Sequence, residues 1–90
     1  MRLYSVELSQ RAQKFLDKLD KHLSGRIKER LKRLERDPVP SDAKFINRED
    51  RDKIFRYRIG DYRALYLVDE SKKIVLIAKI DKRPRIYDVP

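Results

Sequence analysis

The chain has 90 residues, a length that suits one small domain with a single layer of helices on a sheet. Its 24 basic residues outnumber its 15 acidic ones and give a formal charge of +9, which favours nucleic acid or an acidic protein as the partner over a membrane surface. The absence of cysteine excludes disulfides, thiolate metal sites and thiol nucleophiles. No run approaches about 18 apolar residues and no apolar leader opens the chain, so we expect one cytoplasmic domain over residues 1–90. The charged fraction of 43% resembles thermophile composition.

The first third of the chain predicts one strand and a helical hairpin. Residues 3–8 alternate apolar and polar side chains, as a half-buried strand does. Ser9 suits the N-cap of the next helix. The apolar stripe of that helix recurs at helical spacing, at Ala12, Phe15, Leu16 and Leu19. For the second helix we expect an N-cap at Ser24 and an end near Asp37, because Pro38 disfavours helical geometry in the residue before it. The short connection makes the two helices antiparallel.

The remaining residues predict a sheet. Residues 38–52 show no clear period, although residues 43–46 could add a short strand. Residues 54–68 read as a hairpin, and residues 73–80 as a strand that is covered on both faces and therefore interior. The expected fold is α+β in the order β-α-α-β-β-β: a small antiparallel sheet of about four strands with the N-terminal helical hairpin packed on one face.

The hairpin is the most informative stretch. Its two β-branched and aromatic runs are joined by Gly60-Asp61, and a two-residue loop with glycine first suits a type II′ turn. This loop sets Ile59 opposite Tyr62 and Arg58 opposite Arg63. Because side chains alternate along a strand, one face carries the apolar set and faces the helices. That set is Phe55, Tyr57, Ile59, Tyr62, Ala64 and Tyr66.

The opposite face of the hairpin carries Arg56, Arg58 and Arg63. Like charges directly opposite each other destabilise a strand pair by about 0.2–1 kcal/mol, so this arrangement works against folding. It can be a solvated face whose arginines pair with nearby acidic residues, or an anion site where a phosphate relieves the repulsion. On either interpretation we expect these side chains to be open to solvent, and we expect Arg63→Ala to leave folding nearly unchanged.

The run Phe55-Arg-Tyr-Arg-Ile-Gly-Asp-Tyr-Arg-Ala-Leu-Tyr66 resembles the central signature of the RelE/ParE toxin superfamily. The N-terminal strand, the helical hairpin that ends in an Asp-Pro step, and the terminal run Lys82-Arg-Pro-Arg-Ile-Tyr87 match the same layout, so the resemblance covers nearly the whole chain. The signature does not separate RelE-type from ParE-type members.

In the RelE-type branch, the resemblance implies a ribosome-dependent endoribonuclease that cuts messenger RNA in the decoding site. Attack by a ribose 2′-hydroxyl yields a cyclic phosphate, without metal or cofactor. The family's catalytic positions correspond to Arg56, Arg58, Arg63, Arg83 and Tyr87. Candidate substrate-binding residues are Arg85 (also the alternative register for Arg83), Lys82 and Lys53. This chain has arginine at 56 and 58, where several members have lysine; arginine stays protonated, so the general base is unassigned.

The resemblance also implies a tightly bound antitoxin. A chain of charge +9, with apolar Leu65 and Leu67 near the arginines, suits an acidic RelB-like antitoxin that folds on binding. Two other functions remain open: a ParE-like inhibitor of DNA gyrase, and an inactive toxin homologue that acts as an antitoxin-binding co-repressor. His22, the only histidine, is expected to be a surface residue, and no metal-ligand spacing occurs.

Overall fold

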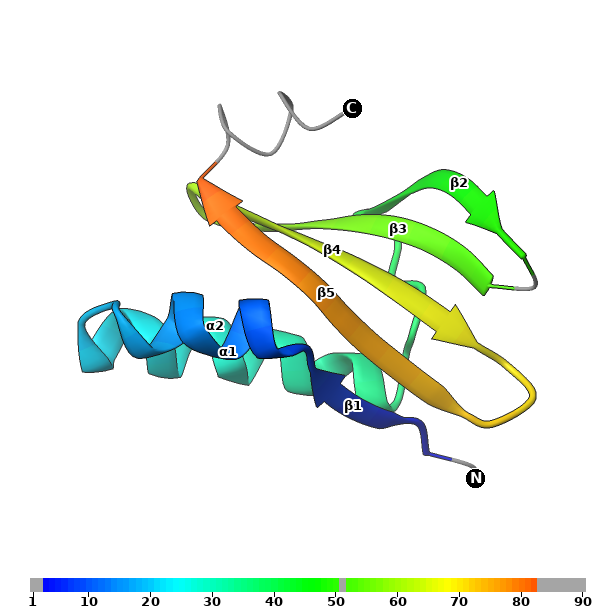
Figure 1. The fold of residues 1–90 in the computed structure, drawn as a ribbon, viewed down its shortest axis with the longest axis horizontal. Coiled ribbons are helices and arrows are strands. Elements are labelled where there is room, and N and C mark those ends of the chain that lie inside the picture. Colours follow the sequence, from blue (N-terminus) through cyan, green and yellow to red (C-terminus); the bar gives the residue numbers. More distant parts are fainter. Residues whose placement is uncertain (1–2, 51, 83–90) are drawn as a thin grey trace.

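The computed structural model describes residues 3–50 and 52–82, and these follow the predicted order of a strand, two helices and a run of strands (Figure 1). The helical part comprises α1 (Gln10–Asp17), α2 (Lys21–Lys32) and a short 3-10 helix, η1 (Arg33–Glu35). The strands are β1 (Ser5–Leu8), β2 (Ala43–Glu49), β3 (Asp52–Ile59), β4 (Tyr62–Asp69) and β5 (Ile74–Lys82). None of these helices has the length and apolarity needed to cross a membrane.

The predicted α+β fold is confirmed, with the helical hairpin on one face of the sheet (Figure 1). The sheet has five strands in the order β1-β5-β4-β3-β2, one more than the approximate four expected. It is mixed, because β1 runs parallel to β5 while the other pairs are antiparallel. The helical hairpin connects β1 to the antiparallel run of β2 to β5. The last strand of this run, β5, pairs with β1 in the parallel direction and so lies inside the sheet, as predicted.

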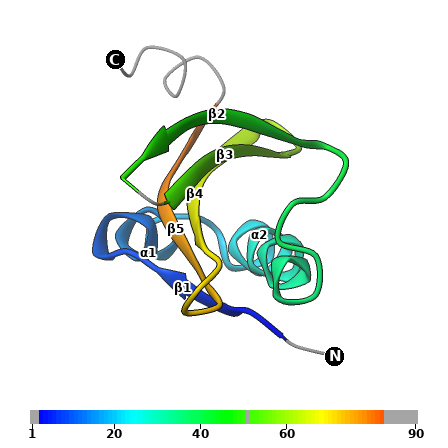
Figure 2. The same ribbon diagram turned by 90° about the vertical axis from the view of Figure 1, so that its right-hand side faces the viewer.

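Three boundaries differ clearly from the prediction. The second helix was expected to end near Asp37, but α2 ends at Lys32 and the 3-10 helix η1 continues it only to Glu35. The second helix starts at Lys21, because the Asp20 side chain accepts a hydrogen bond from the Leu23 amide at 3.3 Å and caps α2; Ser24 lies inside the helix. Strand β2 extends from residue 43 to residue 49 rather than to 46. Six of its seven residues are exposed, so it has no buried face to produce an alternating pattern. Figures 1 and 2 show β2 at the edge of the sheet furthest from the helices.

The core lies between the helices and the apolar face of the hairpin, as the alternation predicts. Phe55, Tyr57, Ala64 and Tyr66 are all buried there with α1 and α2 residues. Tyr66 is fully buried, and its hydroxyl donates to the Pro38 carbonyl at 2.7 Å. Burial raises the pKa of the Tyr66 phenol, so this group remains a neutral donor. The bond ties the loop after η1 to the centre of the sheet.

A β-bulge changes which residues of β5 face the core. Leu65 pairs with Lys79 but Tyr66 pairs with Ile77, which leaves Ala78 as the extra residue. The Ser9 hydroxyl, which caps α1 by accepting from the Ala12 amide, donates to the Ala78 carbonyl at 2.8 Å. Strict alternation would put Ile80 on the face opposite Val75 and Ile77, but after the bulge all three are buried together. Lys79 and Asp81 therefore fall on the helix-free face.

The hairpin register is as predicted from Gly60-Asp61, with Ile59 opposite Tyr62 and Arg58 opposite Arg63. Gly60 has a φ of 58°, whereas Asp61 is not among the residues of positive φ, as a type II′ turn requires. A Cβ built on Gly60 would meet nothing within 4 Å, so the need for glycine here is conformational rather than steric.

The two glycines provide a matched test of this turn. Gly60→Ala should lower the free energy of unfolding by about 1 kcal/mol, because an L-residue is disfavoured at positive φ. Gly25→Ala, in the middle of α2 with equally open space, should raise it by about 1 kcal/mol through helix propensity. Denaturant unfolding measures both, and a stabilising Gly60→Ala would contradict the turn assignment.

Candidate functional site

Basic side chains line a hollow on the helix-free face of the sheet, near the Gly60-Asp61 turn. We call it the cationic hollow; its volume is about 340 Å³. It lies beside the edge of β3 where β2 begins. Its lining residues are Ser41, Asp42, Ala43, Lys44, Arg56, Arg58 and Arg63. The arrangement brings the three hairpin arginines to one place, away from the helices.

Strand pairing explains how these side chains come together. Arg58, Arg63 and Asp81 form one row across β3, β4 and β5. In the next row, Arg56 is paired with Lys44 on β2 on one side and with Leu65 on β4 on the other. Lys44 is a site residue that sequence reasoning missed, because the register between β2 and β3 includes a bulge after Phe45 and cannot be read from a periodic pattern.

Arg63 differs from its predicted environment. It was expected to be open to solvent, but it is only 5% exposed. Its Nη1 donates to the carbonyls of Gly60 and Tyr62, both at 2.9 Å. These bonds fold the side chain back over the turn, and the opposing Asp81 supplies a negative charge on the side away from Arg58. Arg63 therefore holds the turn and also lines the hollow, whereas Arg58 is exposed.

Arg30 on α2 supports the hollow from the helix side, and sequence reasoning also missed it. Its Nη2 lies 3.4 Å from an Asp42 carboxylate oxygen and 3.4 Å from the Arg58 carbonyl. The guanidinium carbon is 5.4 Å from the centre of the Tyr57 ring, within the range of a cation–π contact. The only sequence signal is its position next to Leu31 in the apolar stripe of α2. Arg30 thus joins the helix, the loop before β2 and the end of β3.

The other predicted site residues lie elsewhere or outside the described residues. Lys53 is at the opposite end of β3, where its Nζ lies 3.4 Å from Glu70. Lys82 is exposed at the end of β5, opposite Tyr62. Arg83, Arg85 and Tyr87 lie outside the described residues.

Two further expectations concern the apolar and metal-binding residues. Leu65 and Leu67 are half-buried on the helix-free face. Leu65 pairs with Arg56 of the hollow, and Leu67 pairs with Ile54 and Leu76, so these leucines form an apolar strip on this face. Over residues 3–50 and 52–82, no group of histidine, cysteine or carboxylate side chains could hold a metal ion. His22 is exposed, as expected.

Carboxylates are unevenly placed around the arginines of the hollow. Glu49 and Asp52 face each other at the end of β3 that is far from the hollow. Among the described residues that line the hollow, Asp42 is the one carboxylate, and it contacts Arg30. The excess of positive charge at the hollow is therefore suited to an anion such as a phosphodiester.

The arrangement of a helical hairpin on one face of a twisted sheet matches that of solved RelE structures. The chain belongs to the RelE/ParE superfamily: residues 6–87 match the family model described as ParE toxin of type II toxin-antitoxin system, parDE. A protein of Methanocaldococcus jannaschii named "Putative toxin RelE1" is 32% identical over 88 residues, which span 97% of this chain and 98% of the relative.

Solved structures agree with this assignment. The archaeal RelE–RelB complex from Pyrococcus horikoshii contains a chain that is 31% identical, with a TM-score of 0.82 over 92% of this chain and 98% of that one. The RelBE2 toxin–antitoxin complex from Mycobacterium tuberculosis gives 31% identity and a TM-score of 0.77, over 92% of this chain and 94% of its match. The isolated Escherichia coli RelE toxin, at 23% identity, shares the fold with a TM-score of 0.73 over 93% and 90% of the two chains.

The contacts of Arg63 reverse the expectation that it can be removed without effect on folding. Arg63→Ala should lower the free energy of unfolding by about 2 kcal/mol, because two charge-assisted bonds to turn carbonyls are lost in a buried setting. Arg58→Ala, its exposed cross-strand neighbour, should change it by less than about 0.5 kcal/mol. Urea unfolding of both variants measures this difference, and equal effects would show that the turn bonds contribute little.

Proposed function

We propose that this toxin is a ribosome-dependent endoribonuclease that cleaves messenger RNA in the decoding site. The observation that carries the proposal is the convergence of Lys44, Arg56, Arg58 and Arg63 on one hollow of the helix-free face. Relatives of 31–32% identity that are named RelE support the RelE-type branch.

The proposed reaction is attack by a ribose 2′-hydroxyl on the adjacent phosphodiester, which leaves a cyclic phosphate and a free 5′-hydroxyl. Charge develops on the phosphate oxygens, and fixed cations stabilise it most when they need no rearrangement. Arg63 meets this condition because two carbonyls hold its guanidinium. Arg58, exposed beside it, can donate two hydrogen bonds to one phosphate. We assign to Arg56 and Arg83 the stabilisation of the negative charge that develops on the phosphate in the transition state. We assign to Tyr87 the stacking on a base.

The test adds the purified protein to messenger RNA in a cell-free translation reaction and compares cleavage in the presence and in the absence of ribosomes. Cleavage inside translated codons, only on ribosome-bound messenger, is the expected result, with 2′,3′-cyclic phosphate ends. Arg58→Ala should lower the single-turnover rate by about 10², since removal of one preorganised donor has an effect of this order. Lys53→Ala, on the same strand but at the far end, is the matched control and should cleave at the wild-type rate. Intact messenger with the wild-type protein would overturn the proposal.

A proton acceptor for the 2′-hydroxyl is also needed, and arginine cannot act as one. We propose Asp42, the carboxylate that lines the hollow. Asp42→Asn should lower the single-turnover rate by about 10², as expected on loss of a general base. The contact with Arg30 is partly exposed, so the amide should leave folding intact. Asp61→Asn, at the turn, is the control; unchanged cleavage by Asp42→Asn would place the base elsewhere.

The proposed partner is an acidic, RelB-like antitoxin, and the proposed location is the cytoplasm. RelE–RelB and RelBE2 complexes of relatives support an antitoxin partner. The apolar strip of Leu65 and Leu67 beside the cationic hollow is a suitable surface for an apolar and acidic segment that folds on binding. An antitoxin segment bound to this surface would cover the hollow and block the binding of substrate.

A second candidate is inhibition of DNA gyrase, which the description of the matching family model as a ParE toxin favours. Cells that express the chain would then lose negative supercoiling while their messenger stays intact. Mapping of messenger ends and plasmid topology after induction separates the two candidates. Absence of both effects would leave the third, an inactive homologue that acts with its antitoxin as a co-repressor.

A further inference from the structure

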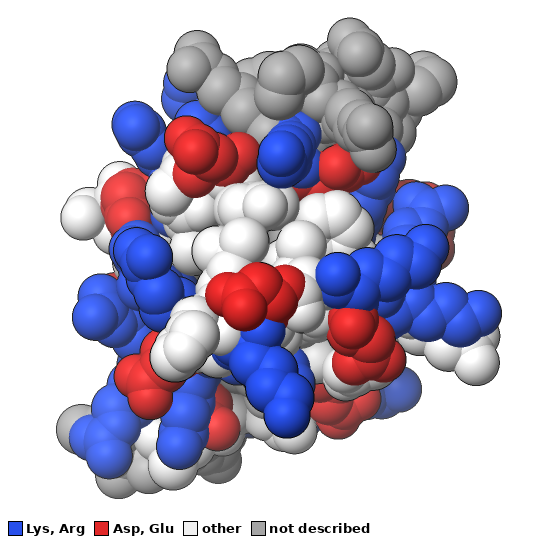
Figure 3. All heavy atoms as spheres, turned by 90° about the vertical axis from the view of Figure 1, so that its left-hand side faces the viewer, with Lys and Arg blue, Asp and Glu red and all other residues white. Residues whose placement is uncertain are grey.

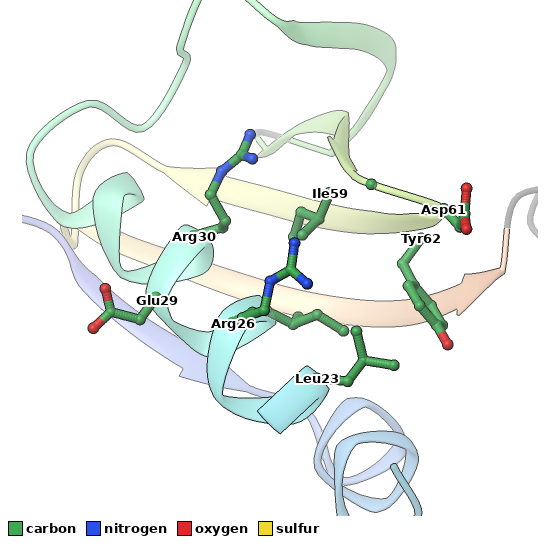
Figure 4. A pocket seen from close by; sticks show the side chains of 9 residues that line it. Leu23, Arg26, Glu29, Arg30, Ile59, Asp61 and Tyr62 are labelled. Carbon is green, nitrogen blue, oxygen red and sulfur yellow. The ribbon is translucent and has the colours of Figure 1, made fainter. Parts of the chain in front are cut away.

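A second cavity lies on the helix side of the hairpin turn, and neither the hollow nor the proposed cleavage uses it. We call it the α2–turn cleft; its volume is about 460 Å³. Figure 4 shows it between α2, the end of β3 and the start of β4. Its lining residues are Leu23, Arg26, Ile27, Glu29, Arg30, Ile59, Gly60, Asp61 and Tyr62. The sheet separates most of it from the cationic hollow.

Two arginines on successive turns of α2 supply positive charge to the cleft. Arg26 and Arg30 both extend from the helix toward β3 (Figure 4). Arg26 is exposed and has no hydrogen-bond or ion-pair partner within residues 3–50 and 52–82. The Nε of Arg30 is buried and lacks an acceptor there, and its Nη2 bonds are long, at 3.4 to 3.5 Å. Both guanidiniums therefore have unused hydrogen-bonding capacity.

The rest of the cleft is apolar, and its rim is acidic. Ile27, Ile59 and Tyr62 are buried side chains whose edges form its walls, with half-buried Leu23 beside Tyr62. Glu29 and Asp61 lie at opposite margins (Figure 4). Figure 3 views the molecule from the end that carries the turn, where an uncharged patch is bordered by side chains of both signs. Carboxylates at the margins repel a run of phosphates, whereas a single carboxylate beside an apolar side chain satisfies both the arginines and the walls.

We propose that the α2–turn cleft is a docking site for an amphipathic peptide segment of the antitoxin that presents one carboxylate beside an apolar side chain. One carboxylate of that segment binds the guanidiniums of Arg26 and Arg30, and a neighbouring apolar side chain packs between Leu23, Ile59 and Tyr62. The inference rests on the proposed antitoxin partner, but it assigns a second contact surface on the face opposite the hollow. Binding here places the antitoxin against the Gly60-Asp61 turn, whose carbonyls hold Arg63.

The test uses the full-length chain and, as the probe, the purified product of the neighbouring gene, with dissociation constants measured by titration. Arg26→Glu should weaken binding by about tenfold or more, because a carboxylate in the partner meets a like charge. Arg11→Glu is the matched control: it makes the same charge change at an exposed position of α1 that does not line the cleft, and it should stay within about threefold of wild type. Hydrogen exchange should show new protection at the amides of residues 60–62 in the complex.

The outcomes separate this inference from the proposed function. Tight wild-type binding with equal losses in both variants, or no protection of the turn, would overturn the docking site and leave the antitoxin partner intact. No binding by the wild-type chain would overturn both. If Arg26→Glu instead weakened binding to ribosomes or RNA and left the antitoxin affinity unchanged, the cleft would be an RNA contact and the peptide proposal would be wrong.

Discussion

The Gly60-Asp61 turn is the constraint on which the rest of the structure depends. Because strand side chains alternate with a period of two, a slip of one residue would turn the aromatic core face outward and the arginines toward the helices. The two-residue loop prevents such a slip by fixing Arg58 opposite Arg63. Glycine at its first position allows the positive φ of this turn without strain. One backbone feature thus determines both which side chains form the core and which form the cationic hollow.

The hollow also shows how the fold accommodates like charges. Arg58 and Arg63 are directly opposite, an arrangement that opposes pairing of β3 and β4. Arg63 avoids the full repulsion because its guanidinium binds two turn carbonyls, and its strand neighbour on the other side is Asp81 of β5. Asp81 reaches that row only because the Ala78 bulge shifts the alternation of β5. The same bulge carbonyl accepts a bond from Ser9, the cap of α1, so the start of the helical hairpin and the charge balance of the hollow depend on one irregularity.

The sequence predicts those parts of this fold that follow from local patterns. Alternation and a glycine-led loop are enough to give the hairpin register and the buried face of Tyr57 and Tyr66. The extent of β2 is not predictable in this way, because nearly all of it is exposed and its register is bulged. Arg30 and Lys44 reach the site through tertiary packing and strand pairing, which leave no periodic trace. Arg63 shows the limit for single residues: its face was predicted correctly, but its burial depends on where the guanidinium finds acceptors.

Arg30 makes the two cavities of the molecule interdependent. It lines the α2–turn cleft, while its Nη2 contacts Asp42 and the Arg58 carbonyl at the margin of the cationic hollow. These contacts are at the long end of the hydrogen-bond range, and the buried Nε has no acceptor among the described residues. The Arg30 guanidinium is therefore weakly held, although it is partly buried. A carboxylate that enters the cleft competes with Asp42 and Arg58 for the same donors. A ligand in the cleft would therefore share Arg30 with the end of β3 that presents Arg58, without entering the hollow itself.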